Sequence, residues 1–132
     1  MTVVVKAQPK DEIKVVAKAL VESESFVKKQ FGDMADFDNS QVEAIANVSP
    51  STRKRDRDNI KLVVEWLGLS FSTENRETAK GTERNRFGYW SRDAVVLYRA
   101  YRQVMARFNC PRDYKRNTNY WLPLIAKEYG SK

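Results

Sequence analysis

The chain has 132 residues and a formal net charge of +7, with a single cysteine and no histidine. The lack of histidine excludes Ser-His-Asp triads, zincin-type metal sites and HNH-type nuclease sites. The single cysteine, Cys110, excludes an internal disulfide and a cysteine-built zinc site. A chain of this length fits one compact domain, so we expect residues 1–132 to share a single core.

The first six residues lack the basic start and long apolar stretch of a signal peptide. No run of the sequence is apolar for long enough to cross a bilayer. We therefore expect a soluble intracellular protein, cytoplasmic with the nucleus and the virion as alternatives, and no membrane partner. No residue pattern indicates a cofactor or a bound metal.

Charge is distributed unevenly along the chain. Residues 1–48 contain six lysines, eight acidic residues and no arginine, a net charge of −2. Residues 49–132 contain eighteen basic and nine acidic residues, a net charge of +9, and all twelve arginines. The planar guanidinium pairs with phosphate through two N–H groups and stacks on rings, which lysine does not. The pattern predicts a mildly acidic helical scaffold in 1–48 and an arginine-rich binding half in 49–132.

Two helices are predicted in the first half. Apolar residues at helical spacing favour a helix over 10–31, opened by Pro9 and ended by Gly32. Ser40 and Glu43 have the spacing of a capping box, which predicts the start of a short helix over 41–48. We interpret both helices as scaffold.

A third helix is predicted over 53–67, after the break at Ser49-Pro50 and before Gly68. Its polar first turns are expected to project into solvent. Their cations are either a solvated surface with local ion pairs or a phosphate-contacting segment. The buried face is predicted to consist of Ile60, Val63, Val64 and Leu67, and the cations are Arg53, Lys54, Arg55 and Arg57.

Residues 69–72 alternate apolar and polar, which is typical of a half-buried strand, and 87–90 are suited to a return strand. If the two pair, they form a hairpin similar to a wing, which places cations over a nucleic-acid backbone. If they do not, 69–90 is a long basic loop, and both outcomes make it a contact region. Tyr89 and Trp90 either stack on exposed bases or fix the segment to the core. The cations of this region are Arg76, Lys80, Arg84 and Arg86.

The same region holds acids and a lysine of the kind found in metal-dependent nucleases. Two residues separate Glu77 from Lys80, where the nuclease motif has one. On a strand, this spacing puts the two side chains on opposite faces. We therefore expect no enzymatic activity.

Ser91 as an N-cap and Asp93 in the first turn predict a helix over 92–109. Its broad apolar and aromatic face, with Tyr98 and Tyr101, is expected to lie in the core. Three arginines lie off that face and are expected to form an outward ridge. These are Arg92, Arg99 and Arg102. A last helix is predicted between a cap at Asn119 and the stop at Gly130.

Together these patterns predict a mainly α fold, a compact bundle of about five helices with a small wing-like β-hairpin between helices three and four. The leading functional prediction is a non-enzymatic nucleic-acid-binding protein, a regulator or accessory factor of DNA rather than RNA. The alternative is a protein–protein interaction module, an inhibitor or a viral structural or assembly subunit, that docks on an acidic partner. The apolar stripes of 10–31 and 92–109 cover either each other or a second copy of the chain, so the oligomeric state is open. The predicted nucleic-acid contacts are Arg53, Lys54, Arg55, Arg57, Arg76, Lys80, Arg84, Arg86, Tyr89, Trp90, Arg92, Arg99 and Arg102.

Overall fold

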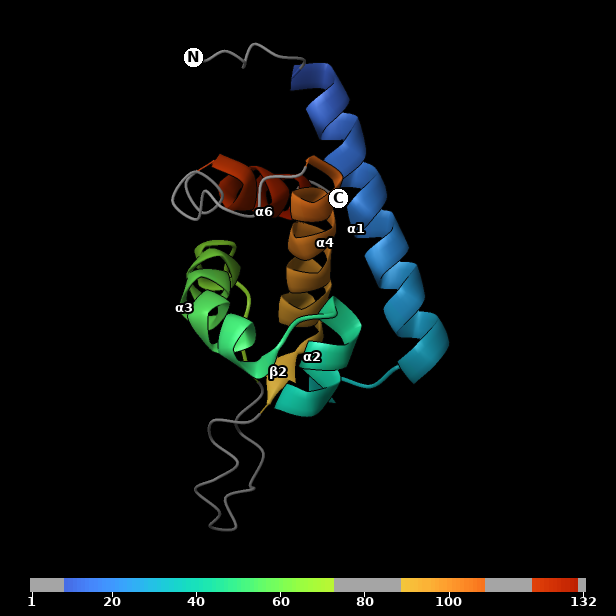
Figure 1. Ribbon diagram of the computed structural model, residues 1–132, viewed down its shortest axis with the longest axis vertical. Helices are drawn as coiled ribbons and strands as arrows, with labels where there is room; N and C mark the ends of the chain where they lie inside the picture. The colour runs from blue at the N-terminus through green and yellow to red at the C-terminus, as the bar shows by residue number, and fades with distance from the viewer. Residues whose placement is uncertain (1–8, 73–88, 109–119, 131–132) are drawn as a thin grey trace.

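A computed structural model describes residues 9–72, 89–108 and 120–130 (Figure 1). Five helices and a two-stranded antiparallel sheet make up this part of the chain. This confirms the predicted mainly α bundle with a small sheet. In chain order the elements are α1 (Pro9–Phe31), β1 (Asp36–Phe37), α2 (Asn39–Ala46), α3 (Pro50–Trp66), β2 (Trp90–Ser91), α4 (Arg92–Phe108) and α6 (Leu122–Gly130).

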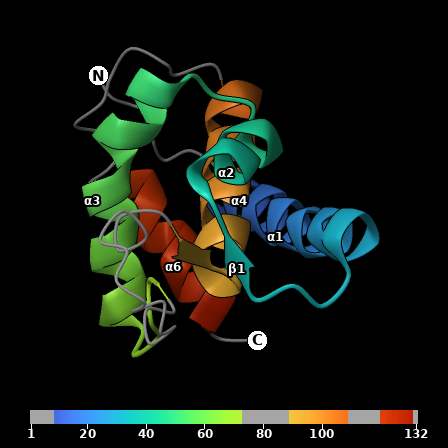
Figure 2. The ribbon, with the colours of Figure 1, turned by 90° about the horizontal axis from the view of Figure 1, so that it is seen from below.

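The central helix is α4. It packs against α1, α2, α3 and α6, and Figures 1 and 2 show it between α1 on one side and α3 on the other. Residues 94–98 are all buried, so the helix is covered on more than the single face of a surface helix. Tyr98 and Tyr101 lie in the core as predicted. Polar side chains at the flanks of α4 therefore extend into its contacts with the neighbouring helices before they extend into solvent.

Two predicted helix ends are confirmed. Gly32 after α1 and Gly68 after α3 adopt φ values of 61° and 81°, a region that glycine enters without the steric cost met by other residues. The amide of Gly32 donates to the carbonyl of Lys28 at 2.9 Å and so closes the last turn of α1. Each glycine therefore both ends its helix and turns the chain away from the helix axis.

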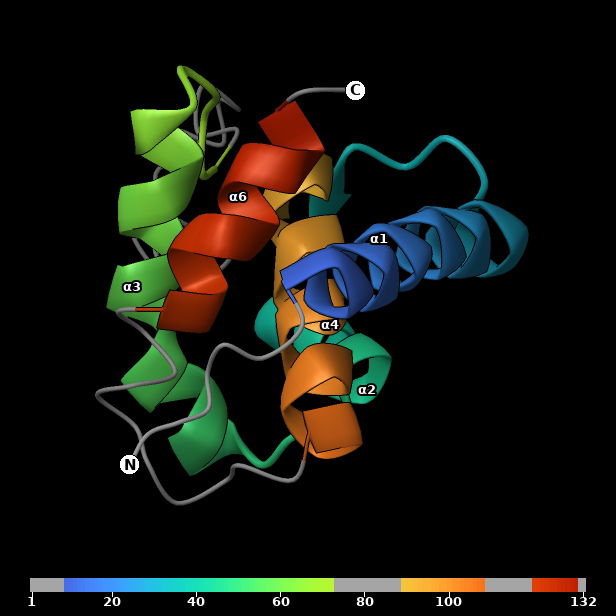
Figure 3. The ribbon, with the colours of Figure 1, turned by 90° about the horizontal axis from the view of Figure 1, so that it is seen from above.

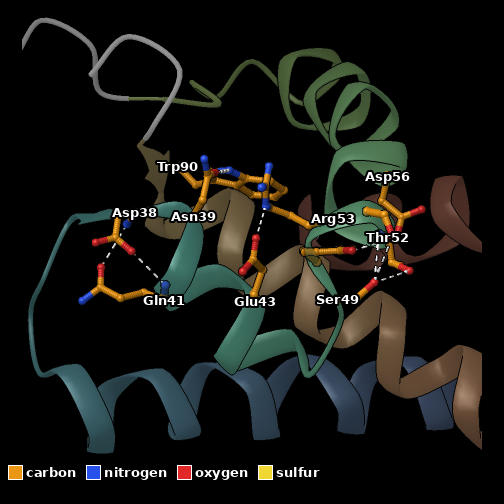
Figure 4. Close-up of polar contacts among 11 residues, drawn as sticks. Asp38, Asn39, Gln41, Glu43, Ser49, Thr52, Arg53, Asp56 and Trp90 are labelled. Carbon is orange, nitrogen blue, oxygen red and sulfur yellow. Dashed lines mark hydrogen bonds and ion pairs between the residues drawn. The ribbon is translucent and has the colours of Figure 1, made fainter. Parts of the chain in front are cut away.

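Helix α2 begins earlier than predicted, and its N-cap is Asp38 instead of Ser40. The Asp38 carboxylate accepts from the Gln41 backbone N–H at 2.8 Å, and the Gln41 side-chain oxygen accepts from the Asp38 N–H at 2.9 Å (Figure 4). Glutamine completes a capping box as well as glutamate does. The sequence thus contained two overlapping capping boxes, and the earlier one forms.

Helix α3 also begins earlier than predicted. Its first turns project into solvent at Lys54, Arg55 and Asp58 as predicted, but the prediction is wrong for Arg53 and Asp56. The Ser49 hydroxyl caps it by accepting from the Thr52 N–H at 3.2 Å. Pro50 occupies the first turn, where its missing N–H costs little. The additional turn fixes the helical phase so that Arg53 and Asp56, 7% and 2% exposed, face inward. These two residues tie α3 to its neighbours.

The small sheet has a different strand partner from the expected one. β2 pairs antiparallel with β1, with Phe37 opposite Trp90. The predicted strand 69–72 reaches β2 through one hydrogen bond, in which the Ser91 N–H donates to the Phe71 carbonyl at 2.7 Å. The segment 73–88, predicted as a wing or a loop, lies outside the described residues. This bond holds Phe71, near the end of one described segment, beside Ser91, near the start of the next.

Candidate functional site

Arg53 holds α3 against α2. Its Nε donates to a Glu43 carboxylate oxygen at 2.7 Å, and the two side chains are 8% and 19% exposed. Figure 4 shows this pair between the two helices. Removing one partner of such a pair leaves a charge that is largely shielded from water. Arg53, a predicted phosphate contact, therefore serves the fold.

Asp56 lies at the seam between α3 and α4. The Tyr98 hydroxyl donates to Asp56 Oδ2 at 2.8 Å, and Arg102 donates to the same oxygen at 3.3 Å. Arg55 Nε lies 3.8 Å from the other oxygen. Burial, and then the Asp56 charge, raise the pKa of Tyr98 far above its ordinary value. The Tyr98 hydroxyl therefore stays protonated and continues to donate to the carboxylate.

Arg92 and Arg99 are directed toward α1 and the segment that follows it. Arg92 donates to the backbone carbonyl of Met34 at 2.8 Å. Arg99 donates to the buried Ser23 hydroxyl at 3.1 Å, and its guanidinium lies 4.2 Å from the centre of the Phe26 ring. Burial lowers the pKa of Arg99. Arg99 therefore joins α4 to α1, and Arg92 joins α4 to the segment after α1.

The predicted outward ridge of Arg92, Arg99 and Arg102 does not form. The first two contact residues of α1 and its following segment, whereas Arg102 contacts α3. The physical reason is the central position of α4, whose flanks are closed by neighbouring helices. Helical spacing placed the three arginines off the apolar face, but it carried no information about what covers the flanks.

Trp90 lies in the core. Its side chain is fully buried, its ring is stacked on Tyr98 with centroids 5.4 Å apart, and its indole N–H donates to Asn39 Oδ1 at 3.2 Å. Of the two interpretations open for Trp90, the one that fixes the segment to the core is therefore confirmed. Tyr89, directly before it, is half-buried.

The remaining predicted contacts are on α3 or outside the described residues. Arg57 is one-third exposed, lies 3.2 Å from an Asp58 carboxylate oxygen and covers the Phe71 ring. Lys54 and Arg55 are exposed. The predicted contacts in 73–88, which the structure leaves undescribed, are Arg76, Lys80, Arg84 and Arg86.

The outward side of α3 carries the largest exposed apolar side chains of the described chain. Leu62 and Trp66, one helical turn apart, are each 65% exposed. Figures 2 and 3 show α3 at the edge of the molecule, with no other described element on its far side. We define the α3 outer face as its exposed residues from the second turn on, namely Lys54, Arg55, Asp58, Lys61, Leu62, Glu65 and Trp66.

The sequence analysis did not identify Leu62 and Trp66, although a signal was present. Ile60, Val63, Val64 and Leu67 supply the inward face as predicted, with Ile60 and Val64 buried and the other two half-buried. Two further apolar residues four positions apart remained outside that face. A second apolar row on a helix that already has an inward one indicates a second contact.

Within the described residues, no group of three or more acidic, cysteine or histidine side chains is placed to hold a metal ion. None of the described helices is both long and apolar enough to cross a membrane. A shallow hollow of about 410 Å³ lies between α1 and α4, with Val15 and Val104 in its lining and Lys18 and Arg107 among its charged residues.

Comparison with known proteins does not supply a function. No protein-family model matches the chain, and neither a curated protein nor a solved structure is significantly similar to it. Function therefore has to be inferred from the side chains that the fold exposes.

Proposed function

We propose that the protein is a non-enzymatic interaction module that docks on a protein partner through the α3 outer face. The observation that carries this proposal is the pair Leu62 and Trp66, each 65% exposed on a rigid helix. Protein interfaces combine an apolar core, in which tryptophan is enriched, with a polar rim. Here the rim is supplied by charges of both signs on the same helix.

The size of the apolar pair bounds its contribution. Leu62 and Trp66 expose roughly 250 Å² of side-chain surface, which corresponds to about 6 kcal/mol when a partner covers it. Association itself costs at least about 4 kcal/mol. The pair therefore anchors a partner but does not hold it alone, and the flanking charges must meet complementary groups.

The mixed charges of the face favour a protein over a polyanion. Asp58 and Glu65 stand among the three cations of the α3 outer face, and they would repel a phosphate backbone laid along the helix. A protein surface offers charges of both signs and an apolar slot. The alternative prediction from the sequence was also a protein partner, but an acidic one that docks on the basic surface.

The test uses three immobilised proteins: the wild type, one double variant and one single-residue control. A nuclease-treated extract of the producing cells is passed over each of them. The variant Leu62→Ser/Trp66→Ser removes the anchor, and Val21→Ser is the control, because Val21 is 60% exposed on α1. We expect one set of proteins to be retained by the wild type and by the control and lost with the double variant. Equal retention by all three proteins would refute docking through α3.

Nucleic-acid binding is the second candidate function, and the charge of the chain supports it. The net charge is +7, and Lys54 and Arg55 are exposed on α3. Four of the predicted contacts belong to 73–88, outside the described residues. Several cations close together in sequence are suited to contact with a phosphate backbone.

Fluorescence anisotropy of labelled duplex and single-stranded oligonucleotides, titrated over a range of salt concentrations, tests this candidate. A binder loses affinity linearly on logarithmic axes, with a slope of roughly 0.9 per duplex phosphate contact. Arg84→Ala/Arg86→Ala should reduce the slope by about 2, whereas the control Lys28→Ala/Lys29→Ala on α1 should not. Arg92 is left unchanged because it supports the fold. Absence of binding at about 50 mM salt would eliminate this candidate.

A further inference from the structure

The charges on the α3 outer face follow an alternating order. Lys54, Asp58, Lys61 and Glu65 are positive, negative, positive and negative. Their spacings of four, three and four residues place them in one row along the helix. An alternating row of four charges is complementary to its own reverse. The row of one helix therefore matches the row of an identical helix that runs in the opposite direction.

A second row lies about a quarter of a turn further around α3 and contains Arg55, Leu62 and Trp66. In an antiparallel pair of helices, a flanking row of one copy lies against the same row of the other. Lys54 is set opposite the partner's Glu65, and Lys61 opposite the partner's Asp58. In this register Arg55 lies two residues, or about 3 Å along the helix axis, from the level of the partner's Trp66, within reach of its long side chain. An arginine over an indole ring is a favourable cation–π contact. Leu62 then lies close to the two-fold axis.

We propose that the protein partner of this face is a second copy of the chain, packed antiparallel along α3. The inference rests on the proposed function and names its partner. The contact is isologous, so every cross-interface contact occurs twice. In this one register, the charges of the first row face opposite charges, and the side chains of the second row lie against the same row of the other copy. A partner with uniformly acidic or uniformly basic surface would leave half of the charged row facing like charges.

The rest of the molecule is compatible with this contact. Helix α3 has 17 residues and is about 25 Å long, and its far side meets no other described element (Figures 2 and 3). The Asp58 carboxylate is already paired with Arg57 at 3.2 Å, but it is 85% exposed, so the partner's Lys61 can also reach it. The net charge of +7 on each copy opposes association, but charges more than about 8 Å apart in water are largely screened at physiological salt. A single helix pair lies at the small end of stable interfaces, which indicates a dissociation constant of roughly micromolar order.

The decisive experiment uses two charge-reversal variants, Asp58→Lys and Lys61→Glu. In a homodimer, the first sets a lysine against the partner's Lys61 in both halves, and the second sets a glutamate against the partner's Asp58. Each variant alone should dimerise at least about tenfold more weakly than the wild type in sedimentation equilibrium. Mixed in equal amounts, they should pair with each other, because lysine then faces glutamate. Native mass spectrometry distinguishes the heterodimer from both homodimers by mass.

The control is Lys14→Glu, which reverses an exposed charge on α1 and should leave dimerisation unchanged. Circular dichroism melts establish that each variant is folded. As an independent signal, the fluorescence of Trp66 should shift to shorter wavelength as protein concentration rises, because Trp90 and Trp121 are already buried. A wild-type chain that stays monomeric at about 1 mM would overturn the inference. Failure of the mixed variants to form a heterodimer would also overturn it. In both cases the extract experiment still decides the proposed function separately.

Discussion

The strongest stability prediction concerns Asp56, the buried carboxylate between α3 and α4. Asp56→Ala removes the acceptor of the Tyr98 hydroxyl and of Arg102. Breaking a buried charge pair by removing one partner costs about 3–5 kcal/mol. The Arg102 side chain is 28% exposed and regains some water, so we take the lower end, about 3 kcal/mol. This is a large part of the roughly 5–15 kcal/mol that stabilises a domain.

The control for this prediction lies two residues away on the same helix. Asp58 is also a carboxylate paired with an arginine, at 3.2 Å, but its side chain is 85% exposed. Asp58→Ala should change the free energy of unfolding by less than about 0.5 kcal/mol. Both variants remove the same carboxylate group. A difference between them therefore comes from the burial and the partners of that group.

Urea unfolding and thermal melts followed by tryptophan fluorescence measure both changes at about 0.1 µM protein, below the roughly micromolar dissociation constant of the proposed α3 contact. We expect Asp56→Ala to lower the thermal midpoint by about 10 °C, because a domain of this length loses roughly 3–4 °C per kcal/mol. Adding Tyr98→Phe to Asp56→Ala should cost less than Tyr98→Phe alone, since the hydroxyl has already lost its acceptor. Equal destabilisation by Asp56→Ala and Asp58→Ala would show that burial of the carboxylate does not govern its contribution.

Three further predictions follow from the same contacts. Arg53→Ala should lower the free energy of unfolding by about 2–3 kcal/mol, because it breaks the ion pair with α2, whereas Lys54→Ala should change it by less than about 0.5 kcal/mol; urea midpoints compare them. Burial, followed by a neighbouring carboxylate, raises the pKa of Tyr98 and Tyr129, so the unfolded chain loses these protons first. The contribution of these two tyrosines to stability should be constant below pH of about 10 and fall above it, and Tyr98→Phe should flatten the fall in a series of urea titrations. Trp66→Phe should remove most of the acrylamide-quenchable fluorescence without lowering the thermal midpoint, since Trp66 is 65% exposed; quenching that persists would mean that another tryptophan is accessible.

The local architecture could be predicted because it depends on neighbours in sequence. Apolar spacing identified the inward face of α3, and the glycines at 32 and 68 ended their helices as expected. Ser91 caps α4 as predicted, with its hydroxyl accepting from the Ala94 N–H at 3.2 Å. These outcomes reflect periodicity and capping, which act over three or four residues. Errors of register, such as the cap of α2 at Asp38, occurred where two capping residues competed.

The tertiary structure decided which groups the arginines contact. Arg53, Arg92, Arg99 and Arg102 contact groups ten to 76 residues away in the chain, and no local pattern specifies such partners. The position of a long arginine side chain depends on which element packs beside it. The composition therefore predicted a basic surface, whereas in the fold these arginines contact α1, α2, α3 or the segment after α1. The same helix packing left Trp66 on the outside, because the described neighbours of α3 all lie on its opposite side (Figures 2 and 3).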